Sequence, residues 1–200
     1  MRRIEEVGKP FAGKPVTLIS AGESTADYLS ETTTDDVVLI NWALSLAPLF
    51  TSRRVYHVSL HNECFVDHAC WRLPNVIPIT GDWAKFPDEL DEKSFVFPGV
   101  QFDDLGDPQL AERIKDPDGC LCHVQNSSHC AIHLAWLWGC RDLRIIGADG
   151  FRGLPAERYD PRLKVPADRQ SQGSPGWYYL ESFRRFVGLF DWDRVTWIGY

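Results

Sequence analysis

Short β-rich runs that alternate with helix-forming segments are the feature that most limits how this chain can fold. The clearest unit is the run SSHCAIHLAWLWG, which predicts a helix that begins at Ser127 or Ser128 and ends before Gly139. A strand over residues 143–147 follows it and leads into Gly-Ala-Asp-Gly. Strands and helices in alternation are typical of a parallel sheet with helices on both faces. We therefore expect an α/β, Rossmann-like fold that forms one domain over residues 1–200.

The other segments follow the same alternation. Residues 75–80 and 94–100 are interrupted by proline, so we expect short strands at outer positions of the sheet. Residues 1–15 predict an N-terminal arm, and the polar stretch 151–173 predicts a lid loop. Strands are also expected over residues 15–22, 36–44, 53–61 and 194–200, and helices over 23–31, capped by Ser24 or Thr25, and over 174–190, capped by Ser174.

Charge and composition exclude several classes of protein. A net charge of −7 and a pI near 5.3 argue against broad binding to nucleic acid. No apolar run reaches the ~18 residues that a membrane span needs. The opening MRRIEEVGKPFAGKP has no apolar core of a secretory signal. We therefore expect a cytoplasmic protein whose six cysteines are reduced.

The stretch from Cys120 to His133 resembles a metal site in composition, because it holds three of the six cysteines and three of the six histidines. His129 and His133 are one helical turn apart and could bind one ion. Against this, the chain has no Cys-x2-Cys pair, and Cys120 and Cys122 are too close for a usual zinc knuckle. The spacing favours no metal, but whether the two histidines hold an ion stays open.

Polar and small residues gather where strands of this predicted sheet end, which is where ligands bind in such folds. The loop with Gly22, Glu23 and Ser24 precedes a helix whose first N–H groups favour an anion such as a phosphate. Asn41 ends the next strand and could contact a base or ribose. An ordinary strand-to-helix turn and a turn-forming asparagine are the alternatives. The region around His61 is expected at the same edge.

The helix at Ser127 offers a second anion-binding start, in which Asn126, Ser127 and Ser128 could donate to phosphate, sugar or base. Simple helix capping is the alternative. Asp149 lies in a Gly-flanked turn after a strand, where its carboxylate could bind a ribose hydroxyl, a metal ion or a proton. Capping of the next turn is the alternative. Phe151 is expected near the same nucleotide.

The order of these segments resembles a known group of proteins. A strand ending SAGES, a strand VVLINWAL and the run SSHCAIHLAWLWGCRDLRIIGADGF are similar to the sialyltransferase-like fold of bacterial CMP-sialic acid-dependent glycosyltransferases. They are also similar to the related domain of flagellin glycosyltransferases and of archaeal 6-hydroxymethyl-dihydropterin pyrophosphokinase-like proteins. The matching positions are Ala21, Gly22, Glu23 and Ser24 in the first loop, Asn41, and Ala135, Gly139, Ile145, Gly147 and Asp149. The resemblance implies a nucleotide over residues 22–24, Asn41 and residues 127–128.

Taken together, these features predict a nucleotide-dependent transferase, most simply a glycosyltransferase that uses a nucleotide-activated sugar and a glycan or small-molecule acceptor. His129 is the expected general base, with Asp149 as second choice. The sequence assigns no cofactor with certainty, although Mg²⁺ held by Asp149 would serve a pyrophosphokinase-like alternative. A non-catalytic nucleotide-binding or assembly protein is another alternative, because no histidine follows His133. A metal-dependent hydrolase and a homo-oligomer also stay open.

Overall fold

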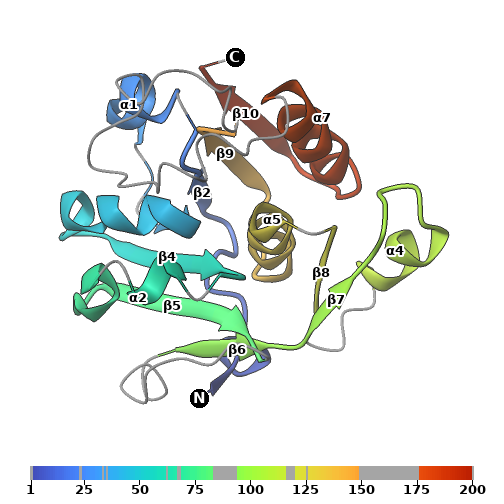
Figure 1. Ribbon diagram of the computed structural model, residues 1–200, viewed down its shortest axis with the longest axis horizontal. Coiled ribbons are helices and arrows are strands. Elements are labelled where there is room, and N and C mark those ends of the chain that lie inside the picture. Colours follow the sequence, from blue (N-terminus) through green and yellow to red (C-terminus); the bar gives the residue numbers. More distant parts are fainter. Residues whose placement is uncertain are drawn as a thin grey trace.

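The fold is seen in a computed structural model of the 200-residue chain, which describes residues 2–22, 24–32, 34, 36–61, 63–66, 69–82, 94–115, 120–124, 126–148 and 176–199. Eight strands form one sheet in the order β1-β6-β5-β4-β3-β2-β9-β10 (Figure 1). Every neighbouring pair in it is parallel. The predicted α/β, Rossmann-like architecture is therefore confirmed.

The strands of this sheet are β1 (Arg2–Arg3), β2 (Pro15–Ile19), β3 (Asp36–Ile40), β4 (Arg54–Ser59), β5 (Val76–Gly81), β6 (Phe95–Phe97), β9 (Asp142–Ile146) and β10 (Arg194–Ile198). A second, two-stranded sheet pairs β7 (Gly99–Gln101) with β8 (Leu121–His123). The α-helices are α1 (Thr25–Tyr28), α2 (Glu63–Val66), α4 (Pro108–Arg113), α5 (Ser127–Leu137) and α7 (Gly176–Val187). The 3-10 helices are η1 (Ile4–Val7), η2 (Leu29–Glu31), η3 (Asn41–Phe50) and η4 (Ala69–Arg72). In the described residues, no helix is long and apolar enough to cross a membrane.

The central strands β2 and β3 are buried almost throughout because both faces of the sheet are covered. All five residues of β3 are buried. Val38 and Ile40 belong to the core that contains α5, whereas Val37 and Leu39 belong to a second core that contains η3. Successive side chains of a strand point to opposite faces, so a strand buried on both sides has no polar alternation.

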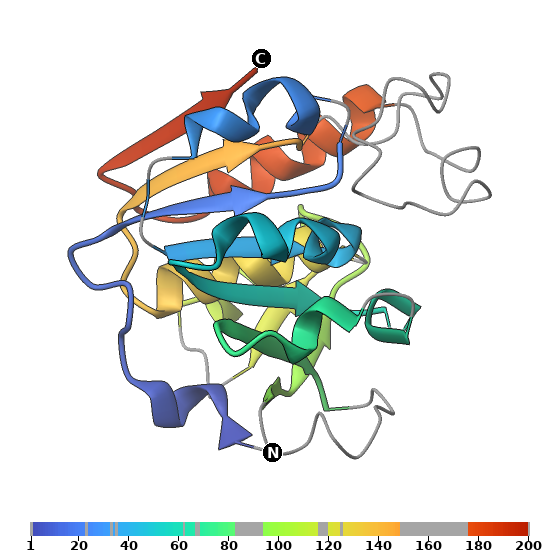
Figure 2. The same cartoon turned by 90° about the vertical axis from the view of Figure 1, so that its left-hand side faces the viewer.

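Different helices cover the two faces of the sheet. Residues of η3, α2 and η4 pack in the core on one face, while residues of α5 and α7 pack in the core on the other. The chain runs from β2 through β3, β4 and β5 in one direction, and β9 lies on the opposite side of β2. The order of strands therefore reverses between β2 and β9, and the strand arrowheads point to one side there (Figure 2).

The N-terminal arm predicted for residues 1–15 is in fact part of the sheet and its core. β1 adds a parallel strand beside β6, and Ile4 and Phe11 are buried. Phe11 packs edge-on against Tyr56 and Trp138, and these contacts hold the N-terminal segment against the body of the protein. The first fifteen residues are rich in charge and glycine, so the sequence did not predict that these two apolar residues are buried.

Two strand predictions need correction. The strand predicted over residues 36–44 ends at Ile40, because Asn41 has a positive φ of 51° and η3 begins there. The strand predicted at an outer position over residues 75–80 is β5, which lies inside the sheet between β4 and β6. Pro78 is tolerated because β6 begins to pair with β5 only at Ile79, one residue later.

Candidate functional site

The carboxyl ends of β2 and β9 meet at the point where the strand order reverses. The Gly22 N–H donates to the Gly147 carbonyl at 3.0 Å, and the Ser20 N–H donates to the Ile146 carbonyl at 3.0 Å. Gly147 has a φ of +71°, and a Cβ there would lie 2.6 Å from the Ser20 oxygen and would also meet Thr25 Oγ1. Only glycine allows these two loops to touch. In open parallel sheets, this reversal is where ligands bind.

Asn41 lies at the end of β3, the strand next to β2, in a left-handed conformation that asparagine tolerates better than most residues. Its side-chain Oδ1 is 2.9 Å from the Ser59 hydroxyl, and its backbone carbonyl is 2.9 Å from His57 Nε2. The turn is therefore held from β4 by two contacts. The half-buried Asn41 side chain is fixed at the carboxyl edge of the sheet.

The polar residues next to Asn41 continue along this edge. Ser59 is in register with Thr80 of β5. The Ser59 hydroxyl accepts the His61 N–H at 3.0 Å and lies 3.1 Å from the His61 carbonyl. The His61 ring stacks on Trp42, with centroids 6.0 Å apart. The Trp42 indole N–H and the Thr80 hydroxyl are buried and have no hydrogen-bond partner among the described residues. Ser59, His61 and Thr80 were not predicted as site residues, although a polar residue directly after an apolar strand is the signal for them.

The start of α5 lies at the same edge. The Ser127 hydroxyl accepts the Leu60 N–H at 3.0 Å, which ties the helix to the end of β4. Asn126, rather than a serine, is the N-cap, and its Oδ1 accepts the Ser128 N–H at 2.8 Å. Ser128 is buried. These three side chains therefore position the helix, and two of them already bind backbone groups of the protein.

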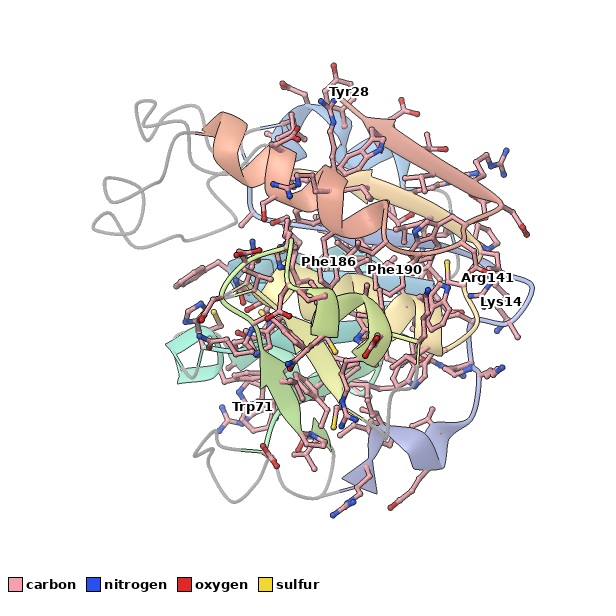
Figure 3. All side chains as sticks on the ribbon, turned by 90° about the vertical axis from the view of Figure 1, so that its right-hand side faces the viewer. Lys14, Tyr28, Trp71, Arg141, Phe186 and Phe190 are labelled. Carbon is pink, nitrogen blue, oxygen red and sulfur yellow. The ribbon has the colours of Figure 1, made fainter. Side chains whose placement is uncertain are left out.

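His129, the predicted general base, lies away from the solvent-facing edge. It is fully buried, its Nδ1 accepts the Val124 N–H at 3.1 Å, and its Nε2 is 3.2 Å from the Ser182 hydroxyl of α7. Its ring stacks on Phe186 at 4.2 Å, between α5 and α7 (Figure 3). Burial, with a smaller contribution from His123, lowers the pKa of His129 to about 3. This geometry favours a packing role.

His133 repeats the arrangement one turn along α5. Its Nδ1 accepts the Cys122 N–H at 2.9 Å, and burial lowers its pKa to about 4. Four residues of helix advance about 6 Å, and two residues of strand advance about 6.6 Å, so the two rings match the N–H groups of Cys122 in β8 and of Val124 directly after it. The opposite edge of β8 pairs with β7. The histidines thus replace a neighbouring strand and close the edge of a small sheet.

The cysteines take no part in a site that the structure describes. All six are free, and five of them are buried. Burial raises the pKa of Cys122 and of Cys140 to about 12, so both remain neutral thiols. In the described residues, no group of three or more His, Cys, Asp or Glu side chains could hold a metal ion.

Several predicted site residues lie outside the described residues. They are Glu23, Asp149, Phe151 and the lid loop over residues 151–173. Of the predicted residues that are described, Gly22, Ser24 and Asn41 follow β2 and β3, and residues 126–128 adjoin the end of β4.

Comparison of the chain with protein-family models, with curated proteins and with solved structures gives no match.

Proposed function

We propose that the chain is a nucleotide-dependent transferase of the glycosyltransferase type, which holds a nucleotide-activated sugar at the carboxyl edge of its sheet. The observation that carries the proposal is the contact of Gly22 with Gly147 at the reversal of strand order, with Asn41 beside it. Gly22 has no side chain of its own, so the two loops lie in contact at the end of the sheet where ligands bind in such folds. We include a cytoplasmic setting in the proposal, because all six cysteines are free thiols.

His61 takes the role of proton acceptor in this proposal, in place of His129. It follows β4 at the same edge and is half-buried, whereas the other described histidines, at positions 57, 123, 129 and 133, are buried. The acceptor hydroxyl gives its proton to His61 as its oxygen bonds to the anomeric carbon. The bond between that carbon and the phosphate oxygen breaks, and the electron pair leaves with the nucleotide.

Asn41 supports the same proposal as a contact for the ribose or base. Ser59 holds its Oδ1, so the amide Nδ2 is directed elsewhere and makes no hydrogen bond to a described residue. An amide NH₂ donates two hydrogen bonds, which suits hydroxyl and carbonyl oxygens of a nucleoside.

Thermal-shift measurements with CMP, UDP, GDP and ATP, each with and without Mg²⁺, test the proposal. Ligand at about 100 times its Kd adds about 2.7 kcal/mol to the free energy of unfolding. For a chain of this length that corresponds to a rise in Tm of about 5–10 °C. A shift with CMP or a nucleoside diphosphate supports the transferase, and a shift with ATP and Mg²⁺ alone favours pyrophosphoryl transfer instead.

Two variants at one position locate the binding site. Asn41→Gly keeps the left-handed backbone and removes the amide, whereas Asn41→Asp keeps the acceptor for Ser59 and adds a negative charge. We expect Asn41→Asp to weaken nucleotide binding by at least about tenfold, and Asn41→Gly to weaken it less. The absence of any shift in the wild type, or an unchanged shift in both variants, contradicts the proposed site.

A further inference from the structure

A cavity lies at the opposite end of the sheet from the candidate site. It has a volume of about 430 Å³. Its wall comes from α1, η2 and the end of η3, with Leu29, Thr32, Leu49, Phe50 and Arg53 among its lining residues. Figure 2 shows α1 and η3 on the same face of the sheet. Thr32 precedes β3 and Arg53 precedes β4, so the cavity adjoins the amino ends of these strands.

Arg53 is the charged group of this cavity. Its Nη1 donates to the Thr32 carbonyl at 2.8 Å, and its guanidinium carbon lies 5.8 Å from the centroid of the Phe50 ring. These two contacts orient the guanidinium but neutralise none of its charge. In the part of the chain that the structure describes, no ion pair joins Arg53 to a carboxylate.

Thr32 supplies an independent polar observation. Its side chain is 5% exposed and lines the cavity, and its hydroxyl makes no hydrogen bond to any described residue. A buried hydroxyl without a partner costs free energy, so a ligand that brings acceptor oxygens is favoured at this place.

The other lining side chains are mixed. Leu49 is 49% exposed although it is a large hydrophobic residue, and Leu29 and Phe50 add apolar surface, whereas Ser30 is polar. An open cavity of a few hundred cubic ångströms that combines apolar side chains with a few directed polar groups can hold a small molecule.

We propose that this cavity binds a small carboxylate with an apolar chain or ring, whose carboxylate pairs with Arg53 and whose apolar part lies against Leu49 and Phe50. A carboxylate matches the fork of a guanidinium and can accept from the Thr32 hydroxyl as well. The proposal is independent of the nucleotide site, which lies at the other edge of the sheet.

Three probes test the chemistry of the ligand: hexanoate, acetate and 1-hexanol, each titrated into the full chain and followed by calorimetry. Hexanoate combines charge and apolar chain, acetate has only the charge, and hexanol has only the chain. We expect hexanoate to bind at least about tenfold more tightly than either of the others. Equal binding of hexanol and hexanoate, or no binding of hexanoate, overturns the proposal.

Matched variants place the ligand in the cavity. Arg53→Gln should weaken hexanoate binding by at least about tenfold. Arg72→Gln is the control, because Arg72 also lies over an aromatic ring, that of Trp71, but does not line the cavity. Leu49→Ser changes an exposed residue and is expected to leave the fold intact while weakening hexanoate and sparing acetate. Unchanged hexanoate affinity in both Arg53→Gln and Leu49→Ser refutes the site.

Discussion

The pair of histidines that closes the edge of β8 makes the stability of the protein dependent on pH in a defined direction. Both rings accept a backbone N–H through Nδ1, so both must be neutral in the folded protein. Protonation removes that acceptor. The perturbation to test is therefore the replacement of both rings, His129→Asn with His133→Asn, which leaves an amide oxygen near each Nδ1 position and removes the titration.

The magnitude follows from the pKa values. The unfolded chain binds protons at these histidines near the ordinary pKa of 6.5, while burial lowers the folded values to about 3 and about 4. The stabilisation is complete above pH 6.5 and is lost as the pH falls toward the folded values, because the unfolded chain binds more protons there. As the pH falls from about 7 to about 5, each histidine lowers the free energy of unfolding by about 2 kcal/mol, and the pair lowers it by about 4 kcal/mol.

Urea unfolding at several pH values between about 7 and 5 measures this loss in the wild type and in the double variant. Carboxylates elsewhere contribute equally to both proteins, so the difference between the two pH slopes isolates the histidines. We expect the variant to lose about 4 kcal/mol less than the wild type over this interval. Identical slopes would refute the reasoning, as would NMR evidence that both imidazoles titrate near pH 6.5 in the folded protein.

Two pairs of substitutions and one labelling experiment test other features of the fold. Gly147→Ala should destabilise by several kcal/mol through strain and a clash, whereas Gly8→Ala, with a similar φ but open space, should cost only about 1–2 kcal/mol, as measured by chemical unfolding. Ser127→Ala should cost about 1–3 kcal/mol by leaving the Leu60 N–H unpaired, and Ser128→Ala less; equal losses would contradict the contact. Iodoacetamide should label the half-buried Cys70 under native conditions and spare the five buried cysteines, and mass spectrometry of the labelled chain would reveal any other pattern.

The elements of the fold were largely readable from local patterns. The helix that ends before Gly139 appears as α5, and Gly139 has the positive φ of 89° that a C-terminal glycine provides. Strands appear over the predicted runs of β2, β4, β9 and β10, although β10 lies at the edge of the sheet and is only partly buried. The end of β3 at Asn41 and the interior position of β5 were missed, because a positive φ and the register of a neighbouring strand are not local signals.

The candidate site was predicted less completely. Asn41 and Gly22 follow neighbouring strands at one edge, and the start of α5 lies at that edge too, which depended on how β8 leads into it. His129 was chosen for its place at a helix start, but burial against Phe186 and two hydrogen bonds remove it from the surface. His61 gains its position from Ser59, at the end of the strand that it follows, and from Trp42, which comes from η3 and is distant in sequence.

The sequence by itself determined the alternation of strands and helices, and with it a parallel sheet covered on both faces. It did so because side-chain periodicity and glycine or capping residues act over a few neighbouring positions. Only the tertiary structure decided what the histidines of α5 do. Their spacing suits a metal ion and suits two alternate backbone N–H groups equally well. The fold decides between these roles, because it brings the N–H groups of Cys122 and Val124 within 3.1 Å of the two rings.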